Sequence, residues 1–363
     1  MTEQTNEIKK IWLDCDPGHD DAIAIILAMG HPKIELCGIS TVSGNASLEQ
    51  TFFNAQIVRD MCGGTANNVP VFRGAERPLL RTIRHDPGIH GVSGLDGSLE
   101  FDTFAKSRKN IIPVDVMETG SGLALTIERI IAVSKQGGDT TSPSLTLVAT
   151  GALTNIALLL RNYEETMKKY IKEIIVMGGA IGVGNRSSVS EFNILCDPEA
   201  AKIVFDSDFK VVMVPLEVTH TAIATKQILQ RIMNGGSNNN NSSKSNSLFN
   251  KIVVDLLTFF ADTYSREFGF RDGPPVHDAC TIAYIIMPEI FEARLMHVDV
   301  ICNALSPADG QTVCDIWGYK KNEMQNVVVC EKMDVDKFFE LCLLAIENCN
   351  KISPVNEKGV ILG

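Results

Sequence analysis

Features that would indicate a membrane or nucleic-acid partner are missing from this sequence of 363 residues. Acidic residues outnumber basic ones, 44 to 33, which gives a net charge of -11. Because phosphate binding needs concentrated Lys and Arg, this balance argues against nucleic acids and acidic membranes and favours a neutral small molecule. No apolar run is long enough to cross a bilayer. The first ten residues are polar and mixed in charge, so no targeting peptide is visible and we expect a cytoplasmic protein.

Paired cysteines are also absent from the sequence. The ten cysteines stand singly, with no CxxC pair and no spacing typical of metal ligands. This scatter argues against a disulfide framework, and several cysteines lie in apolar runs. We therefore expect reduced, buried thiols.

The composition and the order of segments predict the fold class. Hydrophobic residues make up 45% and charged residues 21% of the chain, which is typical of a soluble globular protein. Segments rich in β-branched residues alternate with helical ones, which predicts an α/β fold with an open, mostly parallel, doubly wound (Rossmann-like) sheet and helices on both faces. We expect a single domain over residues 1–363. The predicted strands are 11–16, 34–41, 144–150, 171–177 and 210–214, and the predicted helices begin near residues 20, 47, 121, 154 and 197.

The segment after the first predicted strand carries the clearest chemical signal. Asp14, Asp16, Asp20 and Asp21 lie within eight residues. On a strand the first two share a face, and a Pro-Gly turn then places the other two at the start of a helix. The carboxylates thus meet at the carboxyl end of a strand, where open α/β sheets bind ligands. Any one of them, such as Asp20, could be only a helix N-cap. Four carboxylates together, without Cys or His, indicate a site for Ca²⁺ or Mg²⁺.

This segment resembles the DxDxxxDD signature of the nucleoside hydrolases, enzymes that cleave the N-glycosidic bond of ribonucleosides. The other motifs of that family follow in the family's order, from about residue 11 to residue 348. The resemblance implies the nucleoside hydrolase fold, hydrolysis of ribonucleosides to ribose and free base, and assembly as a homo-oligomer, a dimer or a tetramer. The further motifs are TVSGN (41–45), ATGALTN (149–155), VMGG (176–179), EFN (191–193), DPEAA (197–201) and VHD (276–278).

The resemblance implies a calcium ion and a catalytic base. Asp16, Asp21, the backbone carbonyl of Thr150 and Asp278 would hold Ca²⁺, and ribose hydroxyls and a water would complete its coordination. Asp16 would also deprotonate that water, whose pKa the metal lowers. Because the reaction passes through an oxocarbenium-like state, the water must reach the sugar on the face opposite the departing base.

The resemblance also implies a set of substrate-binding residues. Asp20 and Asn193 would hydrogen-bond ribose hydroxyls, whereas Asn185 and Glu191 would reach the 5′-hydroxyl. Asn45 is also placed to support the carboxylates. On the base, Tyr264 or Phe268 would form a cover. The substrate-binding residues are Asp20, Asn45, His90, Met177, Asn185, Glu191, Phe192 and Asn193.

The second catalytic candidate is His277, which precedes Asp278. A lone His before an Asp is more often structural, but a neighbour that binds metal places His277 at the cavity. The resemblance implies that it acts as the acid towards the leaving base, and a pKa near neutrality suits that step. The purine-specific branch stacks Trp on the base, and neither Trp12 nor Trp317 is suitably placed. We therefore predict a preference for inosine and uridine, or for pyrimidine nucleosides.

Two other functions remain as alternatives at this point. A haloacid-dehalogenase-type phosphatase also has a DxD motif at a strand end, but it usually has Thr or Val where Gly18 stands. A non-catalytic, calcium-dependent ribose binder would need neither Asp16 as a base nor His277 as an acid.

The Asn/Ser-rich segment 234–247 predicts a flexible loop, because it cannot bury enough apolar surface to order itself. That loop is either a neutral surface insertion or a hinge for the helix over 248–268.

Overall fold

The computed structural model describes residues 7–65, 68–108, 122–135, 142–235, 247–320 and 325–357. At its centre is an eight-stranded sheet of order β3-β2-β1-β4-β5-β6-β10-β7. Neighbouring strands are parallel except β10 and β7, which are antiparallel, so the predicted mostly parallel sheet is confirmed. Its strands are β1 (Lys9–Cys15), β2 (Ile34–Thr41), β3 (Val71–Arg73), β4 (Leu145–Ala149), β5 (Ile171–Met177), β6 (Val211–Val214), β7 (Phe291–Met296) and β10 (Val327–Met333).

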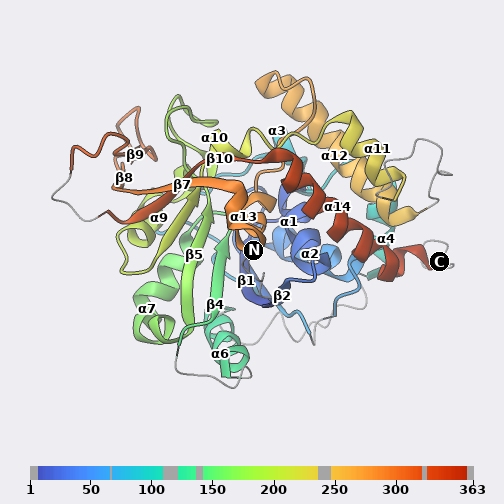
Figure 1. Ribbon diagram of the computed structural model, residues 1–363, viewed down its shortest axis with the longest axis horizontal. Helices are drawn as coiled ribbons and strands as arrows, with labels where there is room; N and C mark the ends of the chain where they lie inside the picture. The colour runs from blue at the N-terminus through green and yellow to red at the C-terminus, as the bar shows by residue number, and fades with distance from the viewer. Residues whose placement is uncertain are drawn as a thin grey trace, which may run out of the picture.

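Helices cover both faces of the sheet and bury a separate apolar core on each (Figure 1). Ile11 and Leu13 of β1 belong to one core and Trp12 belongs to the other, because successive side chains of a strand point to opposite faces. Burial on both faces explains why three successive residues of this strand, Ile11, Trp12 and Leu13, are apolar. The helices are α1 (His19–Gly30), α2 (Leu48–Met61), α3 (Pro87–His90), α4 (Leu99–Arg108), α6 (Gly122–Lys135), α7 (Thr154–Tyr170), α8 (Phe192–Cys196), α9 (Pro198–Phe205), α10 (Leu216–Thr219), α11 (Lys226–Met233), α12 (Leu248–Phe268), α13 (Ala279–Ile286), α14 (Val335–Ile352) and the short 3₁₀ turns η1 (Pro288–Ile290) and η2 (Pro354–Asn356).

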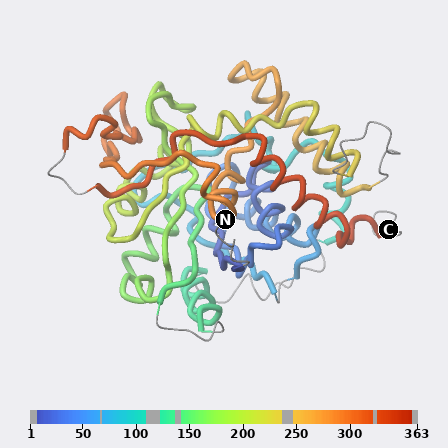
Figure 2. The backbone as a smooth tube through the Cα atoms, in the orientation of Figure 1, coloured from blue at the N-terminus to red at the C-terminus, as the bar shows by residue number. Residues whose placement is uncertain are grey.

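Two peripheral features flank this central body (Figure 2). Helices α11, α12 and α14 pack against one another along one side. A small antiparallel pair, β8 (Val298–Val300) and β9 (Thr312–Cys314), lies outside the main sheet. Within the described ranges, no helix combines the length and apolar character needed to span a membrane. All ten cysteines are unpaired and most are buried, as predicted.

Helix starts follow the sequence signals closely. Ser47 caps α2 by accepting a hydrogen bond from the Gln50 amide at 3.4 Å, and Asp197 caps α9 by accepting from the Ala200 amide at 3.1 Å. For α1 the N-cap is Gly18, so Asp20 lies inside the first turn and is not the cap. The carboxylate of Asp20 is therefore available for another role.

The chain order places a crevice at the ends of β1 and β4. From β1 the sheet continues through β2 and β3 in one direction and through β4 and β5 in the other, which makes this the switch point where open α/β sheets bind ligands. The Thr150 amide donates to the Asp14 carbonyl at 2.8 Å and ties the two strand ends together. The predicted Asn/Ser-rich loop lies largely outside the described residues, since 236–246 are not among them.

Candidate active site

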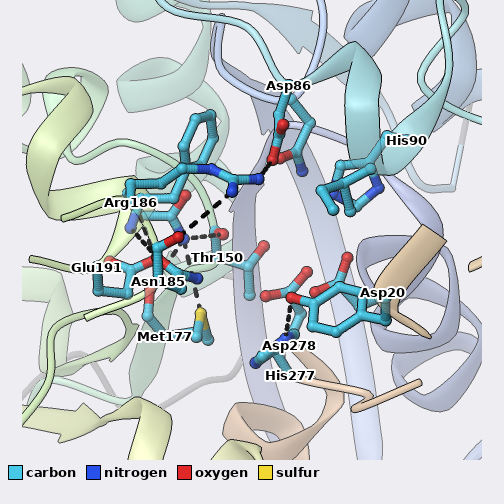
Figure 3. A pocket seen from close by; sticks show the side chains of 15 residues that line it. Asp20, Asp86, His90, Thr150, Met177, Asn185, Arg186, Glu191, His277 and Asp278 are labelled. Atoms are coloured by element: carbon cyan, nitrogen blue, oxygen red, sulfur yellow. Dashed lines mark hydrogen bonds and ion pairs between the residues drawn. The ribbon is translucent and has the colours of Figure 1, made fainter. Parts of the chain in front are cut away.

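A pocket opens at the switch point, and residues from distant segments of the chain line it (Figure 3). Its cavity has a volume of about 30 Å³. All the predicted metal-binding, catalytic and substrate-binding residues except Asp16 and Asp21 line it, and of the two aromatic residues suggested as a cover for the base only Tyr264 does. The lining residues are Asp20, Asn45, Asp86, Ile89, His90, Thr150, Met177, Asn185, Arg186, Glu191, Phe192, Asn193, Tyr264, His277 and Asp278.

Asp16 and Asp21 are fully buried next to this pocket. Asp21 accepts hydrogen bonds from the Thr150 hydroxyl at 2.8 Å and from the Gly18 amide at 3.0 Å. Asp16 accepts one from the Asn45 amide at 2.6 Å through Oδ2. These hydrogen bonds hold each of the two carboxylates in a defined orientation.

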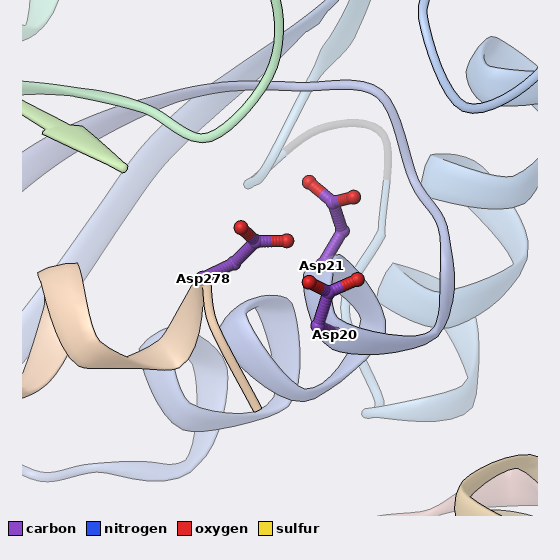
Figure 4. Close-up of side chains that lie close together, drawn as sticks. All are labelled: Asp20, Asp21 and Asp278. Carbon is purple, nitrogen blue, oxygen red and sulfur yellow. The ribbon is translucent and has the colours of Figure 1, made fainter. Parts of the chain in front are cut away.

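Three carboxylates converge closely at the pocket floor (Figure 4). Oxygens of Asp20, Asp21 and Asp278 lie within 4.8 Å of one another, and all three residues are buried. Burial raises the pKa of Asp21 to about 6, and burial together with the neighbouring carboxylates raises the pKa values of Asp20 and Asp278 well above their ordinary range. Carboxylates crowded in this way favour either protonation or a bound cation.

The donor set fits a hard cation. Oδ1 of Asp16 and Oδ1 of Asp20 are buried and have no hydrogen-bond partner among the described residues. Such orphaned acceptors are costly unless a ligand satisfies them. Oxygen donors alone suit Ca²⁺ or Mg²⁺ better than a transition metal.

Asp20 lies close to two of the predicted ion ligands, Asp21 and Asp278. Sequence reasoning assigned Asp20 to a ribose hydroxyl, but its oxygens belong to the close cluster with Asp21 and Asp278. Asp16 is outside that three-residue cluster. The Thr150 carbonyl accepts a hydrogen bond from Nδ2 of Asn193 at 2.7 Å. Because a carbonyl oxygen has two lone pairs, this bond leaves one free.

Glycines in two strand-end motifs allow the backbone to approach Asp16. A Cβ atom at Gly151 would lie 2.5 Å from Asp16 Oδ1, and one at Gly44 would overlap Oδ2. Neither position tolerates a side chain without displacing the carboxylate. This close approach is a physical reason for the glycines in the TVSGN and ATGALTN motifs.

The polar residues that the sequence assigned to the sugar are held by backbone contacts. Glu191 caps α8 and accepts from the amides of Gly179, Asn193 and Ile194 at 2.8 to 3.0 Å. Oδ1 of Asn185 accepts from the Phe192 amide at 2.9 Å. These contacts immobilise the polar lining in advance of any ligand.

His277 lies between two hydroxyl groups. Its Nδ1 is 2.8 Å from Oγ1 of Thr219, and its Nε2 is 2.7 Å from the hydroxyl of Tyr264. Burial lowers the pKa of His277 well below its ordinary value, so the ring is neutral near pH 7. This differs from the near-neutral pKa expected from sequence, and the reason is complete desolvation. Tyr264, suggested as a cover for the base, also lines the pocket, and its hydroxyl contacts His277 there.

An ion pair at the pocket was missed by sequence reasoning. Arg186 donates to Asp86, and the two residues come from different loops (Figure 3). The guanidinium also lies over the rings of Phe192 and Phe268, 5.7 and 5.3 Å from their centroids. No local pattern marks Asp86, and the only signal for Arg186 is its position beside Asn185.

The fold and the site together define an α/β enzyme with a carboxylate-based cation site at the switch point of its sheet. The chain matches the family model described as inosine-uridine preferring nucleoside hydrolase over residues 11–340. It belongs to this nucleoside hydrolase family, as the sequence motifs indicated. This membership sets aside the phosphatase and the non-catalytic ribose binder as alternatives.

Similar proteins come from several organisms. The chain is 38% identical over 343 residues to a probable ribonucleoside hydrolase of Dictyostelium discoideum, covering 94% of this chain and 96% of that one. It is 36% identical over 343 residues to a pyrimidine-specific ribonucleoside hydrolase of Escherichia coli, with coverages of 94% and 97%. Among solved structures, a purine-preferring ribonucleoside hydrolase from Gardnerella vaginalis matches with a TM-score of 0.77 and 27% identity, covering 95% of this chain and all of that one.

Proposed function

We propose that this protein is a calcium-dependent nucleosidase that hydrolyses ribonucleosides to ribose and free base, with a preference for inosine and uridine or for pyrimidine nucleosides. The observation that carries this proposal is the convergence of Asp20, Asp21 and Asp278 on the floor of a pocket with polar and aromatic walls. Buried carboxylates match a cation, and the amide and carboxylate groups around them match sugar hydroxyls.

The ion would be held by Asp16, Asp21, Asp278 and the Thr150 carbonyl, and Asp20 is close enough to share in binding it. When bound, calcium would lower the pKa of a coordinated water and so favour hydroxide near neutral pH. In this mechanism the free Oδ1 of Asp16 accepts the proton of the attacking water, while Oδ2 stays anchored on the Asn45 amide. That anchor keeps the base in one orientation throughout the reaction.

The leaving base needs a proton from a group that lines the pocket. The Tyr264 hydroxyl and His277 form a neutral hydrogen-bonded pair, with Thr219 on the far side of the imidazole. A proton passes from the Tyr264 hydroxyl to the departing base, and an Nε2–H group of the neutral His277 donates a hydrogen bond that stabilises the phenolate until water returns a proton to it. Burial raises the pKa of Tyr264 well above its ordinary value, so formation of the phenolate depends on this hydrogen bond from His277.

The proposed base preference rests on what lines the pocket. Within the described part of the chain, the aromatic lining consists of Phe192, Tyr264 and the imidazoles of His90 and His277, with no Trp. Trp12 is buried in the core and Trp317 is 80% exposed, so neither stacks on a base. One relative is named as pyrimidine-specific, and one similar solved structure is named as purine-preferring. The absence of a Trp residue that could stack on a purine supports a preference for pyrimidine nucleosides.

An assay of free ribose tests this function directly. We expect release of ribose from uridine, cytidine and inosine by purified protein with calcium, and loss of that release after metal removal. 2′-Deoxyuridine should react about 10⁴ to 10⁵ times more slowly, because a site built for a hydroxyl rejects an analogue that lacks it. Equal rates on uridine and 2′-deoxyuridine would contradict hydroxyl recognition, and full activity without metal would contradict the calcium assignment.

We also propose that the protein forms a homo-oligomer, either a dimer or a tetramer. Light scattering measures the molar mass in solution and so tests this proposal.

A further inference from the structure

Strand β7 forms one edge of the eight-stranded sheet, and β10 is its only partner strand among the described residues. The carbonyls of Ile290 and Met296 accept hydrogen bonds from the amides of the residues directly after and directly before β10, at 2.8 and 3.2 Å. Because main-chain groups alternate in direction along an antiparallel strand, those of Phe291, Ala293 and Leu295 point away from β10. The outer side of β7 is therefore a row of backbone groups with which another strand can pair.

Side chains on both faces of this edge are exposed. The four consecutive residues 292–295 are exposed, whereas the residues at the two ends of the strand are buried. Successive side chains of a strand point to opposite faces, so neither face of the sheet is covered here. An open edge of this kind is normally shielded, and charged side chains are one means of shielding it. The signs of the charges on β7 therefore decide whether the edge repels or attracts another strand.

The charges on β7 are arranged to attract a second copy of the same strand. If two copies pair antiparallel about a twofold axis at Ala293, Glu292 of each copy lies opposite Arg294 of the other, because these residues flank Ala293. Opposite charges across a strand pair attract, whereas an edge with charges of one sign repels its own copy. Within one copy, Glu292 pairs with Lys332 at 2.8 Å and Arg294 pairs with Glu331 at 2.6 Å. Strand pairing thus extends these ion pairs into a row of alternating charges.

The loop that follows β9 adds apolar surface beside this edge. It lies against β7, because Nη1 of Arg294 donates to the Ile316 carbonyl at 2.8 Å. Trp317 and Tyr319 in this loop are 80% and 87% exposed, and no other Phe, Trp or Tyr in the described ranges is exposed. A stable dimer buries about 1,200 to 2,000 Å² in total, more than one short strand pair supplies, and each aromatic side chain that becomes buried adds on the order of 150 Å². Aromatic residues are also enriched at the centres of such interfaces.

We propose that two copies of this chain dimerise through β7, so that their sheets join into one continuous sheet and the loop with Trp317 and Tyr319 packs against the other copy. This inference names the face that would form the proposed homo-oligomer, and in a tetramer it is one of at least two contacts. It does not rest on the proposed catalytic function, because assembly is measured without a substrate. Strands β5, β6 and β10 separate β7 from β4, at whose end the pocket opens.

Charge variants of the full-length protein test the contact by sedimentation velocity at micromolar concentration. Arg294→Glu leaves only negative charge on the strand and Glu292→Arg only positive charge, so we expect the dissociation constant of each variant alone to rise about tenfold or more. An equal mixture of the two variants should regain the wild-type mass, because opposite charges again face each other in a mixed dimer. Asp102→Arg, on the exposed side of α4, is the matched control and should keep the wild-type mass. A monomeric wild-type protein, wild-type mass in either β7 variant alone, or no recovery on mixing would overturn the proposal.

A cross-link gives a second test that does not depend on the charge variants. In the proposed pairing the two Ala293 Cα atoms lie about 5.5 Å apart, within the range that a disulfide spans. We expect Ala293→Cys to form a covalent dimer under mild oxidation, whereas Asp102→Cys and the wild-type protein, whose cysteines are mostly buried, should run as single chains on a denaturing gel. No covalent dimer with Ala293→Cys, or as much with Asp102→Cys, would contradict the pairing. Ribose release from uridine by the same samples shows separately whether the proposed function holds.

Discussion

At the scale of single residues, burial sets the chemistry of this site. Asp14, which accepts from Ser40 and from Nδ2 of Asn155, is fully buried, and desolvation raises its pKa to about 7. The same desolvation lowers the pKa of His277. Carboxyls are thus driven towards protonation and imidazoles towards neutrality, so the site depends on a cation and on neutral hydrogen-bond pairs.

Asp16→Asn is the first prediction at this scale. The change removes the oxygen that accepts the water's proton while it keeps the shape of the side chain. We expect turnover of uridine to fall by about 10² to 10⁴, the usual effect of losing a general base, and further if ion binding also weakens. Asp102→Asn, on the exposed side of α4, is the control and should be neutral. A variant with half of the original turnover would remove Asp16 from the mechanism.

The leaving-group pair gives the second residue-scale prediction. His277→Ala should slow inosine most, because a purine needs protonation to leave, with a loss of about 10² to 10⁴. The rate on p-nitrophenyl riboside should barely change, because that group leaves without a proton. Tyr264→Phe should show the same ranking of substrates, since its hydroxyl lies 2.7 Å from the imidazole. Equal slowing of all substrates by His277→Ala would mean that His277 only supports Asp278.

At the scale of elements, two loops meet at the pocket. One precedes α3 and carries Asp86, and the other joins β5 to α8 and carries Arg186. The second loop is anchored by Glu217, whose carboxylate accepts from three consecutive amides, those of residues 181 to 183, at 2.8 to 3.4 Å. The ion pair between Asp86 and Arg186 joins these two loops at the pocket, so we expect its removal to let the loops part more easily when a nucleoside enters.

The ion pair between the loops can be tested by its removal. Arg186→Gln and Asp86→Asn should each lower KM, because they favour the open state that binds substrate. The pair is only partly buried, with side chains 25% and 16% exposed, so we expect a change of at most about fivefold, corresponding to roughly 1 kcal/mol. The charge-swapped double variant, Arg186→Asp with Asp86→Arg, is the matched control and should restore KM. Opposite effects of the two single changes would show that Arg186 binds substrate instead.

At the scale of the whole molecule, the carboxylate cluster joins distant parts of the chain. Asp20 and Asp21 open α1, whereas Asp278 is the residue before α13. Helix α1 packs against both α13 and α14, so the cluster lies where the beginning and the end of the chain meet. A cation held there would link the two and stabilise the folded state by mass action.

Metal removal should therefore lower thermal stability in a pH-dependent way. The folded pKa values of Asp21, about 6, and Asp14, about 7, exceed the roughly 3.9 of an unfolded Asp. The metal-free folded state thus binds more protons than the unfolded state, and these groups cost stability as pH rises from about 4 to 7. Calcium offsets the ionised carboxylates, so its stabilising effect should grow over that interval.

Calorimetry of dialysed, metal-free protein with and without added calcium measures this effect between pH 4.5 and 8. We expect the difference in Tm to widen with pH, and magnesium serves as the comparison ion. A difference that is independent of pH would contradict the assignment of the raised carboxyl pKa values to the ion site.

The fold follows largely from local patterns in the chain. Apolar runs marked the strands, and Ser47, Thr154 and Asp197 marked helix starts within a residue of those observed. These signals act over a few residues, so they can be read without knowledge of the tertiary structure. The expectation of one domain and that of a flexible loop at 234–247 stay predictions.

The sequence by itself determined the class of chemistry, because an acidic segment between a strand and a helix places carboxylates at the edge of the sheet where ligands bind. The tertiary structure alone decided which partners they meet. It joined Asp20 to Asp278, placed Tyr264 on His277, and paired Asp86 with Arg186. Tyr264 and His277 are 13 positions apart in the sequence, and Asp86 and Arg186 are 100 positions apart. Contacts of this kind depend on crossovers, helix packing and loop paths, which no local pattern of residues specifies.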